Sequence, residues 1–275
     1  MTVPRKITRG LLRRCGRGNF NNLKYRNMNA IYVLWLRQLK RYIRSRSRII
    51  SSVAQPVLFL IALGFGFGPI YAKAGGGNYI EFLSPGIISM SILFTAMIAG
   101  IEIIWDKQFG FLKETLVAPV SRFSIMIGRT LGGATVAMMQ GALIFAITLF
   151  VGFRPESWLM LPAAFLFMFI IAFFFTALGT AIASKMDDMQ SFPLIMQLLI
   201  MPMFFLSGSL FPIDQMPKTL AIIARLNPLS YGVDGIRGTL TSSIHFSLGL
   251  DLLVLSSITF AAVFIGAWLF SKIEA

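Results

Sequence analysis

The stretch LMLPAAFLFMFIIAFFFTALGTAIA, residues 159–183, contains no charged side chain. A helix of this length rises about 37 Å, more than the roughly 30 Å hydrocarbon core of a bilayer. Backbone groups in lipid must be hydrogen-bonded within the protein, so a stretch of this kind predicts a membrane-spanning α-helix. Residues 159–183 therefore place the chain among integral membrane proteins.

Five further stretches pass the same test of length and polarity. The predicted spans are about 50–70, 82–102, 127–151, 159–183, 192–212 and 249–271. The composition agrees, because 56% of the 275 residues are hydrophobic and 13% are charged, whereas soluble domains contain about 25% charged residues. The predicted fold class is an all-α integral membrane protein with six transmembrane helices.

The basic residues predict the orientation of these spans. Residues 1–48 contain 14 of the 25 Lys and Arg and no Asp or Glu, while residues 49–275 contain 11 basic and 11 acidic residues. Because Lys and Arg accumulate on the cytoplasmic side, we expect both termini to be cytoplasmic. We expect residues 1–28 to be a basic N-terminal extension and residues 29–275 to be the transmembrane domain, with Met28 an alternative start to Met1.

Residues 29–48 have the pattern of an amphipathic helix. Apolar and aromatic side chains recur at helical spacing on one face (Ile31, Trp35, Leu39, Tyr42) and arginines on another (Arg37, Arg41, Arg44, Arg48). A basic amphipathic helix lies in the cytoplasmic interface, so Trp35, Arg37, Arg41 and Arg44 are candidate interfacial residues in contact with membrane lipid. Two roles stay open: an orientation signal with a lipid anchor, or in addition a docking surface for a cytoplasmic partner.

Residues 102–129 connect the second and third spans on the predicted cytoplasmic side. Phe109, Leu112 and Leu116 share one helical face, and Pro119 ends the helix at the preceding residue. Force applied to a helix that lies across the ends of two spans moves both spans, although an ordinary loop helix has the same spacing. Beyond it, Gly128 and Gly132 have the spacing that lets two helices approach closely.

Residues 213–248 are too polar for a full span and too apolar for a solvated loop. We interpret them as two short outer helices, about 216–225 and 229–240, which lie at or dip into the outer membrane surface in a re-entrant manner.

Polar residues inside the spans are few. Gln140 and Gln197 are the main ones, and together with Met201 and Phe205 they are the candidate residues lining a pathway, because methionine and aromatic side chains form adaptable apolar surfaces. Glu102 lies near the inner end of the second span and Asp251 near an end of the sixth, and we expect interfacial positions for both. No carboxylate is expected at mid-membrane, which argues against an ion-coupled carrier.

Motifs for catalysis are absent from the sequence. There is no G-x-x-x-x-G-K-[ST] phosphate loop, so this chain has no nucleotide site of that kind. The single Cys15 and single His245 exclude a cysteine-rich or histidine-rich metal centre. We therefore expect no enzyme activity and no cofactor on this chain, and no nucleic-acid partner.

Three segments together resemble the type-2 permease subunits of ABC exporters, and among them the daunorubicin-resistance-like group. DKQFGFLKETLVAPVSR (Asp106 to Arg122) resembles the coupling region of that family. PMFFLSGSLFPIDQMP (Pro202 to Pro217) resembles its Ser-Gly…Phe-Pro…Met-Pro signature, and LNPLSYGVDGIR (Leu226 to Arg237) resembles its Asn-Pro-Leu-x-Tyr…Asp-x-x-Arg element. One departure is Lys107-Gln108, where the family often has Arg-Glu, so that an acidic contact is missing.

The resemblance implies a mechanism and its partners. Two permeases, expected to be a homodimer, pair in the plasma membrane of a prokaryote and dock two ATPase subunits, which hold ATP and Mg²⁺. The implied coupling residues are Asp106, Lys107, Phe109, Phe111, Lys113, Glu114 and Pro119. The implied outer gate consists of Pro212, Pro217, Asn227, Pro228, Asp234 and Arg237, where we expect Asp234 and Arg237 to stabilise the outer helices by pairing.

The function implied is ATP-driven export of amphipathic drugs, lipids or lipid-linked glycans. Two other classes stay open: an integral-membrane enzyme acting on lipid, which needs a cluster of His, Asp or Glu at one membrane face, and a non-transporting membrane scaffold, which does not dock an ATPase.

Overall fold

The computed structural model describes residues 27–73, 78–111, 115, 117, 120–241 and 243–272. This part of the chain is helical and contains no strand. Five helical stretches in it are long and apolar enough to cross a membrane: Arg46–Lys73, Tyr79–Gln108, Arg122–Val151, Trp158–Ser184 and Leu248–Ser271. The all-α integral membrane class is therefore confirmed, with five such stretches where the sequence predicted six.

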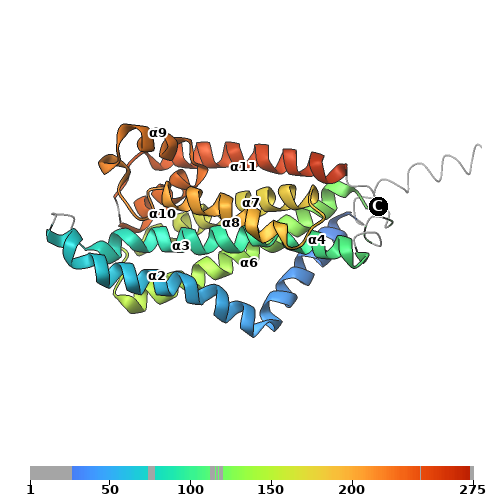
Figure 1. The fold of residues 1–275 in the computed structure, drawn as a ribbon, viewed down its shortest axis with the longest axis horizontal. Helices are drawn as coiled ribbons and strands as arrows, with labels where there is room; N and C mark the ends of the chain where they lie inside the picture. Colours follow the sequence, from blue (N-terminus) through green and yellow to red (C-terminus); the bar gives the residue numbers. More distant parts are fainter. Residues whose placement is uncertain are drawn as a thin grey trace, which may run out of the picture.

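The helices form one elongated bundle (Figure 1). A helix over residues 27–44, called the N-terminal helix below, precedes the labelled elements. The elements are α2 (Arg46–Lys73), α3 (Tyr79–Ile98), α4 (Ile101–Gln108), α6 (Arg122–Val151), η1 (Trp158–Met160), α7 (Leu161–Ser184), α8 (Ser191–Phe205), η2 (Ile213–Gln215), α9 (Lys218–Leu226), α10 (Pro228–Thr241) and α11 (Leu248–Ser271). We call the end with the N-terminal helix and α4 the basic end, and the end with α9 and α10 the far end.

The central helix is α3, which contacts α2, α6, α7, α8 and α10. Its burial is possible because its few hydroxyl groups are satisfied within the helix: Ser84, Ser89 and Ser91 donate to the carbonyl oxygens of Ile80, Pro85 and Ile88 at 2.7–2.8 Å. By contrast, α2 and α11 turn most of their apolar side chains outward, as expected of helices that face lipid or another subunit.

The predicted fifth span, 192–212, is wrong in length. Its helix α8 ends at Phe205 after 15 residues, which is about 22 Å and less than the roughly 30 Å of the hydrocarbon core, so non-helical chain after Phe205 completes the distance to the far end. The chain then turns at Gly208, whose φ of 76° belongs to the left-handed region that glycine adopts readily. Pro202 lies in the last turn of α8 and Pro212 precedes η2, so proline and glycine together end the helix early.

The predicted interfacial helix 29–48 is divided in the structure. The N-terminal helix ends at Arg44, and Arg48 belongs to the first turn of α2. Ser45 separates the two helices: its amide donates to Tyr42 at 3.0 Å, and its carbonyl accepts from Ile49 at 3.2 Å. Figure 1 shows the N-terminal helix, in blue, turned away from the axis of α2. The elbow at Ser45 thus lets the helix lie against other helices of the bundle.

The two short helices predicted in 213–248 are present as α9 and α10, with boundaries within two residues of those expected. Asn227 separates them by accepting from Leu229 at 3.0 Å and donating to the Met203 carbonyl at 2.6 Å. Only α9 has an exposed apolar face, while α10 is buried along most of its length against α3, α7 and α11. Within this chain, α10 is therefore an interior element of the far end.

Candidate functional site

The N-terminal helix packs directly on α6 through two glycines. A Cβ added at Gly128 would lie 3.0 Å from Ile31 Cα, and one added at Gly132 would lie 2.8 Å from Gln38 Cβ. The distance at Gly132 is shorter than side-chain packing allows, and the distance at Gly128 is at the tight end of packing contacts, so a larger residue at either position would require the neighbouring helix to shift. The predicted close approach at Gly128 and Gly132 is confirmed, and the partner is the N-terminal helix of the same chain.

Two side-chain hydrogen bonds fix this contact. Trp35 Nε1 donates to Thr135 Oγ1 at 3.0 Å, and the Tyr42 hydroxyl donates to Gln140 Oε1 at 2.6 Å. Burial raises the pKa of the Tyr42 hydroxyl above its ordinary value, so it stays a donor at neutral pH. Gln140, expected to line a pathway, is fully buried between helices, and its amide nitrogen has no partner. Its visible role is to hold the N-terminal helix.

The arginines of the N-terminal helix and of α2 meet two acids at the start and end of α4. Asp106 accepts from Arg37 at 3.0 Å and from Arg129 at 2.5 Å. Glu102 pairs with Arg41 and with Arg48, both at 3.3 Å. We call these six residues the inner charge cluster. It joins the N-terminal helix, α2, α4 and α6.

Burial differs sharply within the inner charge cluster. The Arg129 side chain is 4% exposed and that of Asp106 6%, whereas Arg37 retains 39%. Removing one partner of a buried pair leaves a charge without compensation, so the Arg129–Asp106 contact holds α4 against α6 tightly. The contacts of the partly exposed arginines are weaker and easier to exchange.

Lys107 links α4 to the end of α7. Its Nζ donates to the carbonyl oxygens of Ser184 at 2.9 Å and Met186 at 3.1 Å, and pairs with Asp187 at 3.0 Å. A cation at this position satisfies carbonyl groups that the helix end leaves free. Gln108 adds a bond from its amide nitrogen to the Asp187 carbonyl at 3.0 Å. A glutamate at position 108 would lack this donor.

Apolar side chains are exposed beyond α4. Phe109 is 69% and Phe111 51% exposed, and Val117 is 81% exposed. The sequence placed Lys113, Glu114 and Pro119 in the same region, but these three lie outside the described residues. An exposed apolar set beside a charged cluster is typical of a surface that contacts another protein.

At the far end, Arg237 and Asp234 do not form the expected ion pair. Arg237 donates to the Gly208 carbonyl at 2.9 Å and to the Phe82 carbonyl at 3.4 Å, and its guanidinium lies 4.1 Å from the centre of the Phe82 ring. Asp234 instead accepts from the amides of His245 and Phe246 at 2.8–3.1 Å. Both side chains therefore bind backbone groups and do not bind each other. Arg237 fixes the turn at Gly208, and Asp234 fixes the turn at His245 and Phe246.

The remaining predicted gate and pathway residues fall into two groups. Pro212 and Pro217 flank η2, and Asn227 and Pro228 form the boundary between α9 and α10. Gln197, Met201 and Phe205 follow one another at four-residue intervals on α8, with Gln197 and Phe205 exposed and Met201 partly buried. Phe205 lines two cavities of about 250 and 400 Å³. The structure thus brings these three together and separates Gln140 from them.

Some residues of the site carried little signal in the sequence. Arg129 lies inside a predicted span, and its partner Asp106 is 23 positions away. Lys107 and Asp187 are 80 positions apart. The detectable signal was an ionisable residue at a span end, which pointed to Glu102 but not to its arginine partners.

Comparisons of the sequence with known proteins identify relatives of this chain. The family model for the ABC-2 type transporter matches residues 29–241. A protein named as a transport permease, ycf38 of Cyanophora paradoxa, is 30% identical over 213 residues, covering 76% of this chain and 73% of its own length. Nodulation protein J of Rhizobium leguminosarum bv. viciae is 30% identical over 194 residues, covering 70% and 74%. The inner membrane transport permease YadH of Escherichia coli (strain K12) is 26% identical over 211 residues, covering 76% and 81%.

The matched region contains the N-terminal helix, the inner charge cluster and α10. Its length exceeds half of the chain, and it includes most of the membrane-crossing stretches. The chain therefore belongs to the ABC-2 type transporter family, as a multi-pass membrane permease.

Proposed function

We propose that this permease is the membrane subunit of an ATP-driven exporter, with its basic end facing the cytoplasm and a separate ATPase docked on that end. The family implies association with an ABC ATPase subunit. In the proposed complex two permeases form a homodimer and bind two ATPases, which hold ATP and Mg²⁺. The permease holds no cofactor and catalyses no reaction, and its place is the plasma membrane of a prokaryote with both termini in the cytoplasm.

The observation that carries the proposal is the way α4 is joined to the bundle. Asp106 ties α4 to α6 and the N-terminal helix, and Lys107 ties it to the end of α7. A push on α4 therefore reaches three other helices through short polar contacts. Because only a two-residue turn separates α4 from the buried α3, the same push also reaches the centre of the bundle.

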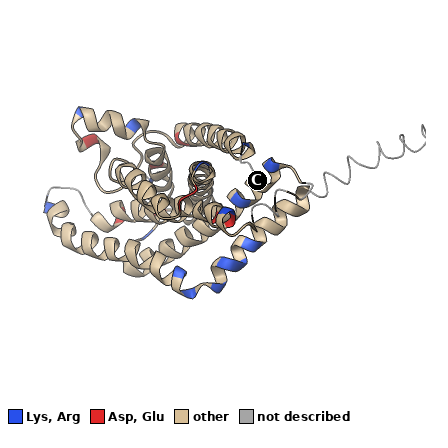
Figure 2. Cartoon of the chain, turned by 45° about the vertical axis from the view of Figure 1, so that its right-hand side comes forward, with Lys and Arg blue, Asp and Glu red and all other residues tan. Residues whose placement is uncertain are grey.

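The receiving surface consists of the exposed apolar residues beyond α4, together with the N-terminal helix. Phe109 and Phe111 offer apolar contact area, and the arginines of the N-terminal helix offer positive charge beside it (Figure 2). Such a combination fits an acidic groove with an apolar floor on a partner protein. We therefore assign coupling roles to Phe109 and Phe111, and include Lys113, Glu114 and Pro119 from the sequence.

The cargo path is proposed along α8 at the interface of two permeases. Leu194 and Leu198, next to Gln197, are 72% and 77% exposed, and a second permease is the partner that would cover them. Phe205 and the adjoining apolar cavities favour cargo with a large apolar part. Amphipathic drugs, lipids and lipid-linked glycans share this property. At the far end, η2, α9 and α10 form the gate.

Co-purification with an ATPase, followed by cargo-stimulated hydrolysis, tests the proposal. The permease and an ABC ATPase of the same organism are expressed together, and the ATPase is captured through a tag on the permease. We expect a stable complex whose ATP hydrolysis rises when an amphipathic cargo is added. A permease that captures no ATPase would be the scaffold. A permease that converts a lipid without an ATPase would be the lipid-modifying enzyme.

A further inference from the structure

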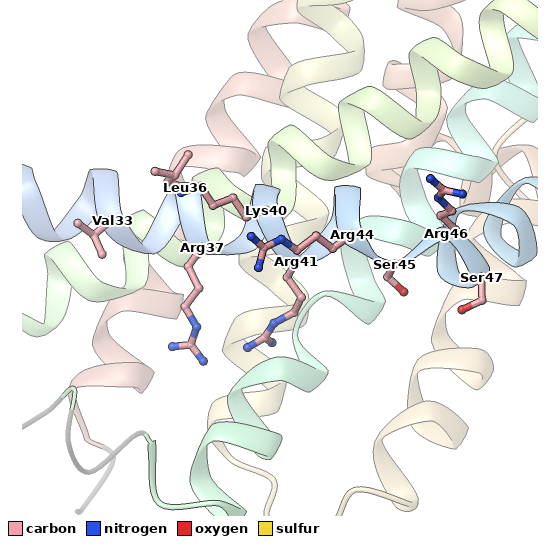
Figure 3. Close-up of a pocket in the computed structure, with 9 residues that line it drawn as sticks. All are labelled: Val33, Leu36, Arg37, Lys40, Arg41, Arg44, Ser45, Arg46 and Ser47. Carbon is pink, nitrogen blue, oxygen red and sulfur yellow. The ribbon is translucent and has the colours of Figure 1, made fainter.

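The elbow between the N-terminal helix and α2 forms a cavity of about 1080 Å³, which we call the elbow pocket. Figure 3 shows its nine lining residues: Val33, Leu36, Arg37, Lys40, Arg41, Arg44, Ser45, Arg46 and Ser47. They include five cations, two hydroxyl groups and no acid. The composition of the pocket points to an anion as its occupant.

The positive charge of the elbow pocket is only partly neutralised inside the protein. Arg37 and Arg41 share Asp106 and Glu102 with Arg129 and Arg48, so two carboxylates serve four guanidinium groups. Lys40 and Arg44 are exposed and form no ion pair with any described residue. A cluster with this excess of like charge attracts an external anion.

The surroundings of the pocket favour an anion that carries an apolar tail. Val33 lines the pocket and is 59% exposed, and Ile43 beside it is 55% exposed. The exposed apolar face of α2 continues from the pocket through Ile50 and Leu58. The candidate span begins at Arg46, so the pocket lies at the depth of lipid head groups when α2 crosses a bilayer.

We propose that the elbow pocket binds the phosphate head group of an anionic amphiphile in the membrane surface, with Lys40 and Arg44 as its principal ligands. The acyl chains lie along Ile50 and Leu58 of α2. The inference goes beyond the exporter proposal, because it requires neither an ATPase nor transport. An occupant here bridges the N-terminal helix and α2, and its presence sets the angle between them.

Binding is measured on the purified full-length permease in neutral detergent, without ATPase, by isothermal titration calorimetry. Three probes are compared: dihexanoyl phosphatidic acid, dihexanoyl phosphatidylcholine and inorganic phosphate. We expect the phosphatidic acid to bind more tightly than either of the others. Inorganic phosphate binding as tightly as the phosphatidic acid would contradict a lipid site, because the apolar wall would then contribute nothing.

The double variant Lys40→Gln, Arg44→Gln locates the site. Removing one positive charge beside an anionic group weakens binding about fivefold. Removing two should therefore weaken the binding of phosphatidic acid about thirtyfold. The matched control, Lys218→Gln, Arg225→Gln, removes two exposed charges from α9 at the far end and should change the affinity less than about twofold. Equal losses in the two variants, or no loss in the first, would refute the site and leave the pocket to an acidic protein surface.

Both variants should fold, because all four side chains are exposed and form no ion pair with any described residue. Equal thermal unfolding midpoints of the two variants and the parent protein verify this. If the first variant is destabilised, Lys40→Gln alone replaces it, and its expected loss is about fivefold. Because binding is measured on the permease alone, loss of lipid binding is scored independently of ATPase capture, which tests the exporter proposal.

Discussion

Asp106 accepts from two arginines that differ in burial, and this difference determines what each contact contributes. Arg129 is enclosed between α4 and α6, while Arg37 keeps more than a third of its side chain in contact with solvent. Screening by solvent reduces the second contact to about 1 kcal/mol or less. The loss of a partner from a buried pair costs about 3–5 kcal/mol.

Asp106→Asn should therefore lower the free energy of unfolding by about 3 kcal/mol, since Arg129 keeps its charge but loses its counter-ion. Arg37→Gln should lower it by about 1 kcal/mol at most. The measurement is unfolding of the purified permease in mixed micelles with increasing dodecyl sulfate. Equal effects of the two variants would contradict the burial difference.

Arg237 acts at the far end as a bridge between backbone segments. Burial lowers its pKa to about 10, while the charge of Asp234 acts in the opposite direction. The guanidinium therefore stays protonated at pH 7 and remains a donor to Gly208 and Phe82. Both carbonyls accept from the same guanidinium nitrogen, Nη2, and the planar guanidinium also lies over the Phe82 ring, a stacked contact that the lysine ammonium lacks.

Arg237→Gln should destabilise the permease by about 2 kcal/mol, because two buried carbonyl oxygens lose charged donors. Arg237→Lys should restore less than half of this loss. Arg225→Gln, on the exposed side of α9, is the control and should have no effect beyond about 0.5 kcal/mol. Full rescue by lysine in thermal unfolding would show that charge alone matters and that the planar guanidinium over Phe82 does not.

At the scale of elements, the N-terminal helix is a packed part of the bundle. Its seat on α6 depends on Gly128 and Gly132, and its basic face is occupied by Glu102 and Asp106. The amphipathic pattern predicted the helix and its two faces, but it did not reveal that one face contacts protein. Periodicity reports which residues share a face, whereas the partner of that face depends on residues far away in the sequence.

Gly132→Leu should displace the N-terminal helix, since even a Cβ there would lie 2.8 Å from Gln38. We expect destabilisation of about 2 kcal/mol and faster tryptic cleavage after the arginines of this helix. Gly249→Leu is the matched control, because nothing lies within 4 Å of a Cβ at Gly249. Tryptic cleavage at the same rate in both variants would contradict close packing of the N-terminal helix on α6.

The connection between α4 and α7 depends on Lys107. Lys107→Gln removes the charge and shortens the side chain, so the carbonyls of Ser184 and Met186 lose their donor. In the complex with its ATPase we expect ATP hydrolysis within about twofold of normal but cargo transport reduced about tenfold, which is about 1.4 kcal/mol of coupling. Lys185→Gln, an exposed neighbour, should change neither activity. Parallel loss of hydrolysis and transport would mean that Lys107 supports the fold without coupling the two.

The sequence predicted an element well where its boundaries depend on neighbouring residues, and poorly where they depend on residues far away in the chain. The helices α9 and α10 were located closely because Pro217, Asn227 and Pro228 act on their own neighbours. The early end of α8 was missed, since the segment after Phe205 is apolar enough to continue a span by hydropathy alone. Its turn at Gly208 depends on the carbonyl that Arg237 holds 29 positions away.

The same limit applies to the candidate site. Phe109 and Lys107 were predicted from a local pattern and from the family resemblance, and the structure adds their surroundings. The ion pairs of Glu102 and Asp106 join positions that are 23 to 69 apart, and no spacing rule connects such positions. Sequence therefore indicated which residues were unusual, and the fold determined which of them meet.

At the scale of the whole molecule, the two ends of the permease are held together by different interactions. Ion pairs join the helices at the basic end, and hydrogen bonds between side chains and backbone groups fix the turns at the far end. Between the two ends lies a largely apolar bundle with α3 at its centre, and most of the ribbon in Figure 2 is tan. This division fits a gate that is operated from the basic end and opens at the far end. In the proposed exporter the energy for that motion comes from the ATPase subunit, since the sequence of the permease contains no G-x-x-x-x-G-K-[ST] phosphate loop.

The most direct test of this claim is ATP-driven movement of a fluorescent amphipathic cargo in proteoliposomes. Three preparations are compared: the permease with its ATPase, the permease with an ATPase variant that binds but does not hydrolyse ATP, and the permease alone. We predict cargo movement only in the first preparation, and only when ATP is present on the side of the basic end. Movement at the same rate by the permease alone, or with ATP supplied only on the side of the far end, would contradict the account.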